Sequence, residues 1–121
     1  MTTEPRLIAA MPSATEVVVV REVDAPPSLV FDAWTALAIA RWYGGDPGRY
    51  VEHQPPRRLV IALAGPAATI EVSFVDHDGR TVVTVRHRFT DAPARDDAVR
   101  DGLIEAWSGR FVRLDAVFAA G

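Results

Sequence analysis

Five stretches of the chain have the apolar and polar patterns of β-strands. Residues 16–23 are rich in β-branched side chains and stop before two consecutive prolines, which predicts a strand that ends there. Residues 57–64, 69–75 and 80–90 alternate between apolar and polar positions, as strands with one buried face do. Residues 48–53 show a weaker and shorter form of the same pattern. These stretches predict most of a sheet.

The pair Asp78-Gly79, between the two clearest strands, is a strong signal for a β-hairpin. If these two residues form the centre of the turn, one face of the hairpin is apolar and pairs Phe74 with Val83, Val72 with Val85 and Ile70 with His87. The other face then pairs Glu71 with Arg86 and Ser73 with Thr84. A shift of one residue would mix the two faces, so we predict this register, with His87 and Phe89 on the buried side.

Two other segments have helical spacing. Residues 28–43 carry apolar side chains in a pattern that predicts two short helices ended by Gly44-Gly45; Ser28 could cap the first, and Pro26-Pro27 could start it one turn earlier. A longer stripe at steps of four and three predicts a final helix of about six turns, capped by Thr90 or Asp91. Its apolar members are Val99, Leu103, Trp107, Phe111, Leu114 and Phe118.

The order of these elements predicts an α+β fold in which the apolar face of an antiparallel sheet packs on the long C-terminal helix. We interpret residues 16–121 as a single domain and residues 1–15, whose apolar stretch is broken by Pro12, as a flexible tail. A chain of 121 residues is long enough to bury a core of its own.

Composition removes several classes of function. The chain has no cysteine, which excludes disulfides, thiolate zinc sites and a cysteine nucleophile and fits a cytosolic protein. All 13 basic residues are arginine, so there is no lysine for Schiff-base chemistry or for a phosphate-binding loop. The net charge of −3 without a basic patch argues against nucleic acid, and no apolar run is long enough to cross a membrane. No residue spacing indicates a cofactor or a metal.

In order, the chain contains the stretches REVDAPPSLVFDAWTALAIARWYG, PPRRLVIAL, DGRTVVTVRHRF and AWSGRFVRLDAVF. Together they resemble the AHSA1-like branch of the START/Bet v 1-type superfamily. The resemblance implies a helix-grip fold, in which the sheet wraps around the last helix and a cavity between them holds a ligand. The four stretches would supply the first strand with two short helices, a central strand, the last strand and the long helix.

The sequence departs from that family in one place. Members usually have an additional β-hairpin after the second short helix, but only about ten residues separate Tyr43 from Pro55-Pro56. We therefore predict a sheet of about five strands rather than seven, with residues 48–53 or the strand after them as an exposed edge. The shorter sheet would also remove one wall of the ligand cavity.

His87 is the titratable residue of greatest interest, because an imidazole on an apolar face can act as a general acid or base. The alternative is a core histidine whose nitrogens are satisfied by neighbouring groups. The aromatic residues also allow two interpretations: they could line a ligand pocket, or they could simply fill the core. The candidate ligand-binding set is Trp34, Trp42, Tyr43, Tyr50, His87, Phe89, Trp107 and Phe111.

Three functional hypotheses follow. The protein binds a small hydrophobic ligand between sheet and helix without chemistry, as the resemblance implies. Alternatively, it is a non-metal enzyme of the cyclase or isomerase type with His87 as acid or base. In the third hypothesis it is an interaction module, a homodimer that pairs through its exposed edge strand. A cavity of at least about 300 Å³ would favour the first, and a solidly filled interior would rule it out.

Overall fold

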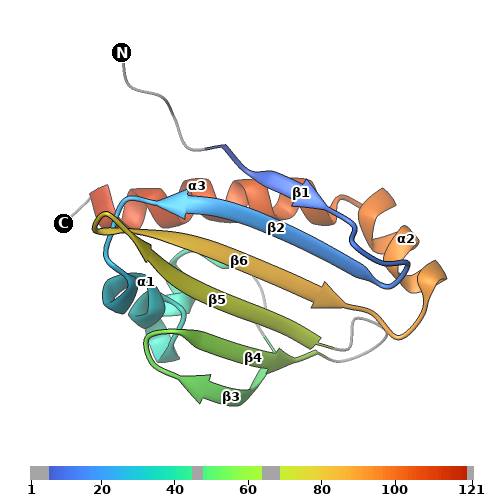
Figure 1. Ribbon diagram of the computed structural model, residues 1–121, viewed down its shortest axis with the longest axis horizontal. Helices are drawn as coiled ribbons and strands as arrows, with labels where there is room; N and C mark the ends of the chain where they lie inside the picture. The colour runs from blue at the N-terminus through green and yellow to red at the C-terminus, as the bar shows by residue number, and fades with distance from the viewer. Residues whose placement is uncertain (1–5, 45–47, 64–68, 120–121) are drawn as a thin grey trace.

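Over residues 6–44, 48–63 and 69–119, which the computed structural model describes, the chain forms a six-stranded antiparallel sheet in the order β1-β2-β6-β5-β4-β3. The helices all lie on one side of it (Figure 1). The strands are β1 (Ile8–Ala10), β2 (Glu16–Val23), β3 (Arg49–Gln54), β4 (Arg58–Ala62), β5 (Thr69–His77) and β6 (Arg80–Arg88). The helices are α1 (Pro27–Ala33), the 3-10 helix η1 (Ala36–Arg41), α2 (Ala92–Arg100) and α3 (Leu103–Ala119).

The predicted fold class is confirmed, and all five predicted strands are present. The sixth strand, β1, lies in the segment that we predicted to be a flexible tail, and that prediction is wrong for Ile8–Ala10. Ile8 pairs with Val20 and Ala10 with Val18, so β1 covers what would otherwise be the free edge of β2. A strand of three residues with exposed side chains is too short to carry an alternating pattern.

The connection between η1 and β3 is short, as predicted. Helix η1 ends at Arg41 and β3 begins at Arg49, which leaves no room for a further hairpin between them. As a result β3 pairs only with β4 and forms one edge of the sheet. The other edge is β1.

The predicted hairpin register between β5 and β6 is confirmed. Phe74 pairs with Val83 and Ile70 with His87, as the separation of apolar and polar faces required. Asp78 and Gly79 have φ values of 54° and 83°, the left-handed backbone of a two-residue hairpin turn. The backbone amide of Gly79 donates to a carboxylate oxygen of Asp76 at 3.1 Å, which stabilises the turn.

Strand β3 contains an irregularity that simple alternation does not predict. The pairing with β4 shifts between Tyr50 and Glu52, so that Tyr50 lies opposite Ile61 while Glu52 lies opposite Val60. This bulge at Val51 places Tyr50 on the inner face of the sheet and Glu52 on the outer face, although they are two residues apart.

Prolines, a capping side chain and a glycine determine where the helices begin and end. Helix α1 starts at Pro27. Of the two predicted starts, the one at the prolines is therefore correct, and Ser28 is not the capping residue. The side chain of Asp91 caps α2 by accepting from the backbone amide of Ala94 at 2.8 Å. The single final helix that we predicted is instead two helices, because the chain breaks at Gly102, whose φ of 99° is far from helical.

The core lies between the inner face of the sheet and the side chains of α1, η1 and α3. Three strands contribute the predicted apolar rows, which are Leu59 and Ile61, then Ile70, Val72 and Phe74, then Val83 and Val85. Helix α3 contributes Trp107, Phe111 and Leu114, all at most 1% exposed. Helix α2 buries none of its residues, so α3 is the helix that the sheet grips.

Candidate functional site

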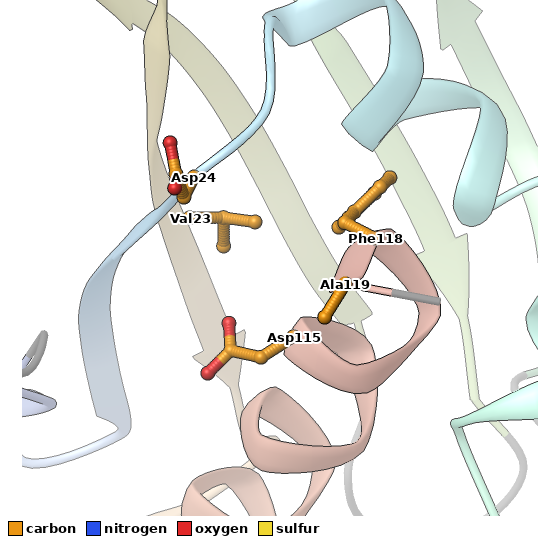
Figure 2. Close-up of a pocket in the computed structure, with 5 residues that line it drawn as sticks. All are labelled: Val23, Asp24, Asp115, Phe118 and Ala119. Carbon is orange, nitrogen blue, oxygen red and sulfur yellow. The ribbon is translucent and has the colours of Figure 1, made fainter. Parts of the chain in front are cut away.

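Two surface grooves lie beside the C-terminal half of α3. The first has a volume of about 280 Å³ and is lined by Val23, Asp24, Asp115, Phe118 and Ala119 (Figure 2). Its two carboxylates already have cationic partners: Arg21 binds both carboxylate oxygens of Asp115 at 2.6 Å, and the Nε of Arg80 lies 3.4 Å from Asp24. The groove therefore offers little uncompensated charge to a ligand.

The second groove has a volume of about 380 Å³ and lies between η1 and α3. Arg41, Arg113, Ala116 and Val117 line it. Neither groove is lined by any of the eight residues that the sequence suggested as a ligand site.

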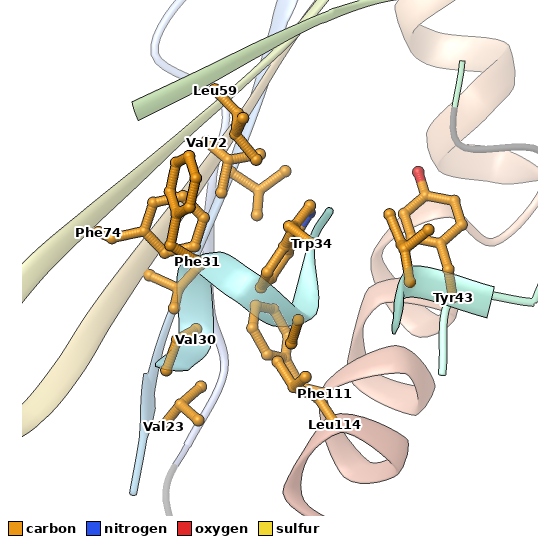
Figure 3. Packing of buried hydrophobic residues seen from close by; sticks show 14 of the residues in the cluster. Val23, Val30, Phe31, Trp34, Tyr43, Leu59, Val72, Phe74, Phe111 and Leu114 are labelled. Carbon is orange, nitrogen blue, oxygen red and sulfur yellow. The ribbon is translucent and has the colours of Figure 1, made fainter. Parts of the chain in front are cut away.

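Those eight residues instead lie together in the protein interior or at its border. Trp34, Trp42 and Trp107 are at most 1% exposed, and Tyr43 and Phe111 are also buried. Figure 3 shows Trp34 at the centre of this packing, between the sheet side chains and Phe111 and Leu114 of α3. The eight residues form one cluster, although they lie on six separate elements and connections.

Most of the aromatic rings contact one another edge-on or tilted, and Trp34 and Trp107 are stacked. The ring centres of Trp34 and Trp42 are 4.4 Å apart, and those of Tyr43 and Trp107 are 5.7 Å apart. Trp107 also lies 5.9 Å from Phe111 and 6.5 Å from Trp34. Among the described residues, side chains rather than a cavity therefore occupy the space between sheet and α3.

His87 lies at the edge of this cluster and is only 4% exposed. Its Nε2 accepts a hydrogen bond of 2.8 Å from the indole N–H of Trp107. Burial, together with a smaller effect of the positive charge of Arg110, lowers the pKa of His87 to about 4. The ring is therefore neutral at physiological pH.

This bond also determines which nitrogen carries the proton. Because Nε2 accepts from Trp107, the neutral ring must hold its proton on Nδ1. The Nε2 lone pair is occupied and the ring is closed off from solvent, so His87 is poorly placed to take a proton from a substrate in this conformation.

Two buried hydrogen-bond donors in the cluster have no partner among the described residues. They are Nδ1 of His87 and the indole Nε1 of Trp34. Both side chains contact Trp107. The indole of Trp42 shows the usual situation, because it donates to the backbone carbonyl of Ala33 at 2.9 Å.

Tyr50 closes the β3 side of the cluster. Its hydroxyl donates to the backbone carbonyl of Trp34. Burial, together with a smaller effect of the nearby Tyr43, raises the pKa of Tyr50 to about 12, so the phenol stays protonated. Glu52, two residues further along β3, is exposed on the opposite face and pairs with Arg58.

Sequence reasoning did not identify Arg110 as part of the site. Its guanidinium lies 4.1 Å from the ring centre of Tyr43 and 4.8 Å from that of Trp107, and its Nε donates to the backbone carbonyl of Tyr43 at 3.0 Å. Its spacing of three from Trp107, one turn along a helix, is the signal that could have indicated the contact.

The hairpin tip and the helices add no further site. Within residues 6–44, 48–63 and 69–119, no group of three or more histidine, aspartate or glutamate side chains is arranged to hold a metal. His77 at the tip lies 3.4 Å from Glu22 across the sheet. In the same part of the chain, none of the helices is both long and apolar enough to span a bilayer.

Comparison with known proteins places this geometry in a family. The sequence profile of the family described as Activator of Hsp90 ATPase homolog 1-like protein matches residues 40–119. A crystal structure of a protein from Rhodobacter sphaeroides superimposes with a TM-score of 0.83 at 16% identity, covering 95% of this chain and 99% of that one. A Mycobacterium smegmatis protein gives 0.77 at 16% identity and 98% coverage of each chain.

A third structure, CalU16 from Micromonospora echinospora, is 23% identical with a TM-score of 0.59 and covers 95% of this chain and 86% of its own. At these identities the structures establish the fold alone. No curated protein matches the chain.

Proposed function

The chain belongs to the Activator of Hsp90 ATPase homolog 1-like family, and on that premise we propose that it binds one small molecule between sheet and α3. The molecule is mostly apolar and carries a hydrogen-bond acceptor. It contacts the aromatic cluster, whose members are Trp34, Trp42, Tyr43, Tyr50, His87, Phe89, Trp107 and Phe111.

The observation that carries this proposal is the pair of buried donors on His87 and Trp34. A donor that is removed from water without a partner costs roughly 1–3 kcal/mol, and native proteins contain few of them. A ketone, ester or similar oxygen on a bound ligand would offset that cost at either donor. A purely apolar ligand would not.

Side chains fill the described interior, which rules out the preformed cavity that the resemblance implied. The proposed ligand instead has to displace side chains. The half-buried residues at the border of the cluster, such as Tyr50, Leu63 and Leu103, are the ones that can move with the least loss of packing. The aromatic rings around them provide the apolar surface that small-molecule sites use.

The two alternative functions have less support. Catalysis by His87 would require an accessible ring, whereas the ring is 4% exposed and its Nε2 is bonded to Trp107. Dimerisation through the edge strand would require a regular β3, whereas this strand is bulged at Val51 and carries Glu52 in an ion pair with Arg58. Bulges and charges are common devices that prevent edge strands from pairing.

The proposal can be tested with two molecules of similar shape, 1-indanone and indane, of which only the ketone has an acceptor. The three tryptophans give three indole N–H signals in the spectrum of ¹⁵N-labelled protein. We expect the ketone to shift the Trp34 signal and to raise the unfolding temperature. At 100 times its Kd, a bound ligand adds about 2.7 kcal/mol to the free energy of unfolding.

Two variants make the test specific. His87→Phe removes one donor and should reduce the preference for the ketone, whereas His77→Phe alters an imidazole that is 65% exposed and should preserve it. If neither molecule binds at millimolar concentration, the proposal loses its support. If indane binds as well as the ketone to the unmodified protein, the site binds apolar molecules, but the proposal that the ligand needs a hydrogen-bond acceptor is wrong.

A further inference from the structure

The groove between η1 and α3 has a different chemistry from the aromatic cluster. Two arginines, Arg41 and Arg113, lie on it together with the apolar side chains of Ala116 and Val117. Its volume of about 380 Å³ is within the range of small-molecule sites. The exposed Val112 lies one helical turn before Ala116 and extends the apolar strip along α3.

The guanidinium of Arg113 is held in place from one side. Its Nε donates to the backbone carbonyl of Trp42 at 2.7 Å, and its Nη2 lies 3.5 Å from the carbonyl of Tyr43. These bonds anchor the side chain at the end of η1, where carbonyl groups lack helical partners. In the described part of the chain its Nη1 makes no hydrogen bond, so this nitrogen can donate to a ligand.

Arg41 and Arg113 differ from most arginines of the described part of the chain in their ion pairs. Seven other arginines form ion pairs with carboxylates, as Arg21 does with Asp115 and Arg58 with Glu71. Over residues 6–44, 48–63 and 69–119, no carboxylate lies within ion-pair distance of Arg41 or Arg113.

Arg110 adds a third positive charge nearby. Burial lowers the pKa of Arg110, and the charge of Arg113 lowers it further. Among the described residues, no carboxylate pairs with Arg41, Arg110 or Arg113, so positive charge gathers here on a chain of net charge −3.

We infer that the groove between η1 and α3 binds an amphipathic carboxylate, with its headgroup on Arg41 and Arg113 and its apolar tail along Ala116 and Val117. Arginine presents paired N–H groups that match a carboxylate, and the anchored Arg113 loses little freedom on binding. This site is separate from the aromatic cluster, and it would exist whether or not a ligand enters the core.

Octanoate is a suitable test molecule, with acetate as the headgroup alone and 1-octanol as the tail alone. We expect octanoate to bind more tightly than either control in isothermal titration calorimetry, and to bind more weakly as ionic strength rises. It should shift the backbone amide signals of 113–117 more than those of β3. Equal binding of octanoate and 1-octanol would overturn the inference.

The decisive variant is Arg41→Gln, because the side chain of Arg41 makes no hydrogen bond with the described residues and its replacement should leave the fold intact. We expect octanoate to bind roughly three- to tenfold more weakly to this variant. Arg57→Gln, an equally charge-neutralising change at an exposed position outside the groove, should leave binding unchanged. Equal loss in both variants would indicate only a general attraction between the anion and positive charge.

A second variant tests the tail. Ala116→Asp places a negative charge on the apolar wall at an exposed helix position, where the substitution is compatible with the fold. It should abolish octanoate binding while 1-indanone binding in the core persists. Octanoate binding that survives both Arg41→Gln and Ala116→Asp would place the anion elsewhere and contradict the inference.

Discussion

The two faces of the same sheet are stabilised in different ways. The inner face presents apolar side chains and aromatic rings to α3, and its one ion pair with that helix is Arg21 with Asp115 among the described residues. The outer face presents charged side chains to solvent. Both faces come from the same strands, in which successive residues point to opposite sides.

Ion pairs cross the outer face from strand to strand. Arg58 on β4 binds Glu52 on β3 and also Glu71 on β5, with its Nε 2.9 Å from the Glu71 carboxylate. At the other end of the sheet, Arg86 on β6 lies 2.8 Å from Glu16 on β2. The hydrogen bond from Arg86 lowers the pKa of Glu16, which keeps that carboxylate charged.

The comparison of the two faces indicates that the inner face contributes most of the stability of the fold. Inner contacts depend on shape and cannot be replaced by water, so the loss of one side chain leaves a void. Outer pairs are partly solvated, and water and salt can substitute for each partner. Mutations on the two faces should therefore differ in size and in their response to salt and pH.

The largest effect is expected from Trp34→Ala. Trp34 is fully buried and contacts Trp42, Phe74 and Phe111, so its truncation should leave a cavity and lower the free energy of unfolding by about 3–5 kcal/mol. Chemical denaturation followed by circular dichroism measures this loss. Val75→Ala on the outer face, where the side chain is 58% exposed, should change stability by at most about 0.5 kcal/mol.

If the two substitutions had similar effects, the comparison between the faces would be wrong. An equal and large loss would mean that the outer face is covered in solution. An equal and small loss would mean that the inner packing is loose.

The next effect is a dependence on pH that comes from His87. Its pKa is about 4 in the folded protein and 6.5 in the unfolded chain, so the unfolded chain binds more protons between these values. The contribution of His87 is therefore complete above pH 6.5 and is lost as the pH falls towards 4. At about 1.4 kcal/mol per pKa unit, the loss is about 3 kcal/mol.

The measurement is the free energy of unfolding from pH 7 to pH 4 in the natural sequence and in His87→Phe. Carboxylates titrate in both proteins, so the difference between the two curves isolates His87. We expect that difference to change with pH, and His77→Gln, at an exposed position, should follow the natural sequence. Parallel curves for His87→Phe and the natural protein would show that the imidazole is not sealed inside the fold.

The faces themselves could be predicted from the sequence, because alternation identifies which residues share a side. The register of β5 and β6 followed from that rule alone, with Phe74 opposite Val83. The bulge at Val51 could not be predicted, since it breaks the alternation that the prediction assumes. The break at Gly102 was hidden because the apolar stripe continues across it from Val99 to Leu103.

The aromatic cluster could be predicted in membership but not in arrangement. Long-range placement of α3 against β6 decides that the indole of Trp107 meets His87, which lies 20 residues earlier. Periodicity places both residues on buried faces and says nothing of the bond between them. For the same reason, the sequence did not indicate whether the rings would line a cavity or fill it.

The outer face should show the smallest effect and the strongest response to salt. Glu71→Gln removes a charge that Arg58 contacts, but both side chains are partly exposed, at 26% and 34%. We expect a loss of about 0.2–1 kcal/mol at low ionic strength, measured by denaturation, and a smaller loss at about 1 M salt, where charges are screened within about 3 Å.

The matched change on the inner side is Asp115→Asn, which removes the charge bound by the buried Arg21. Asp115 is itself 39% exposed, but Arg21 is only 7% exposed, so the loss of the carboxylate leaves a largely buried guanidinium without its partner. This variant should lose more stability than Glu71→Gln and should keep most of that loss in high salt. If salt reduced both losses equally, the inner ion pair would be as solvated as the outer ones, and burial would not distinguish the two faces in their electrostatics.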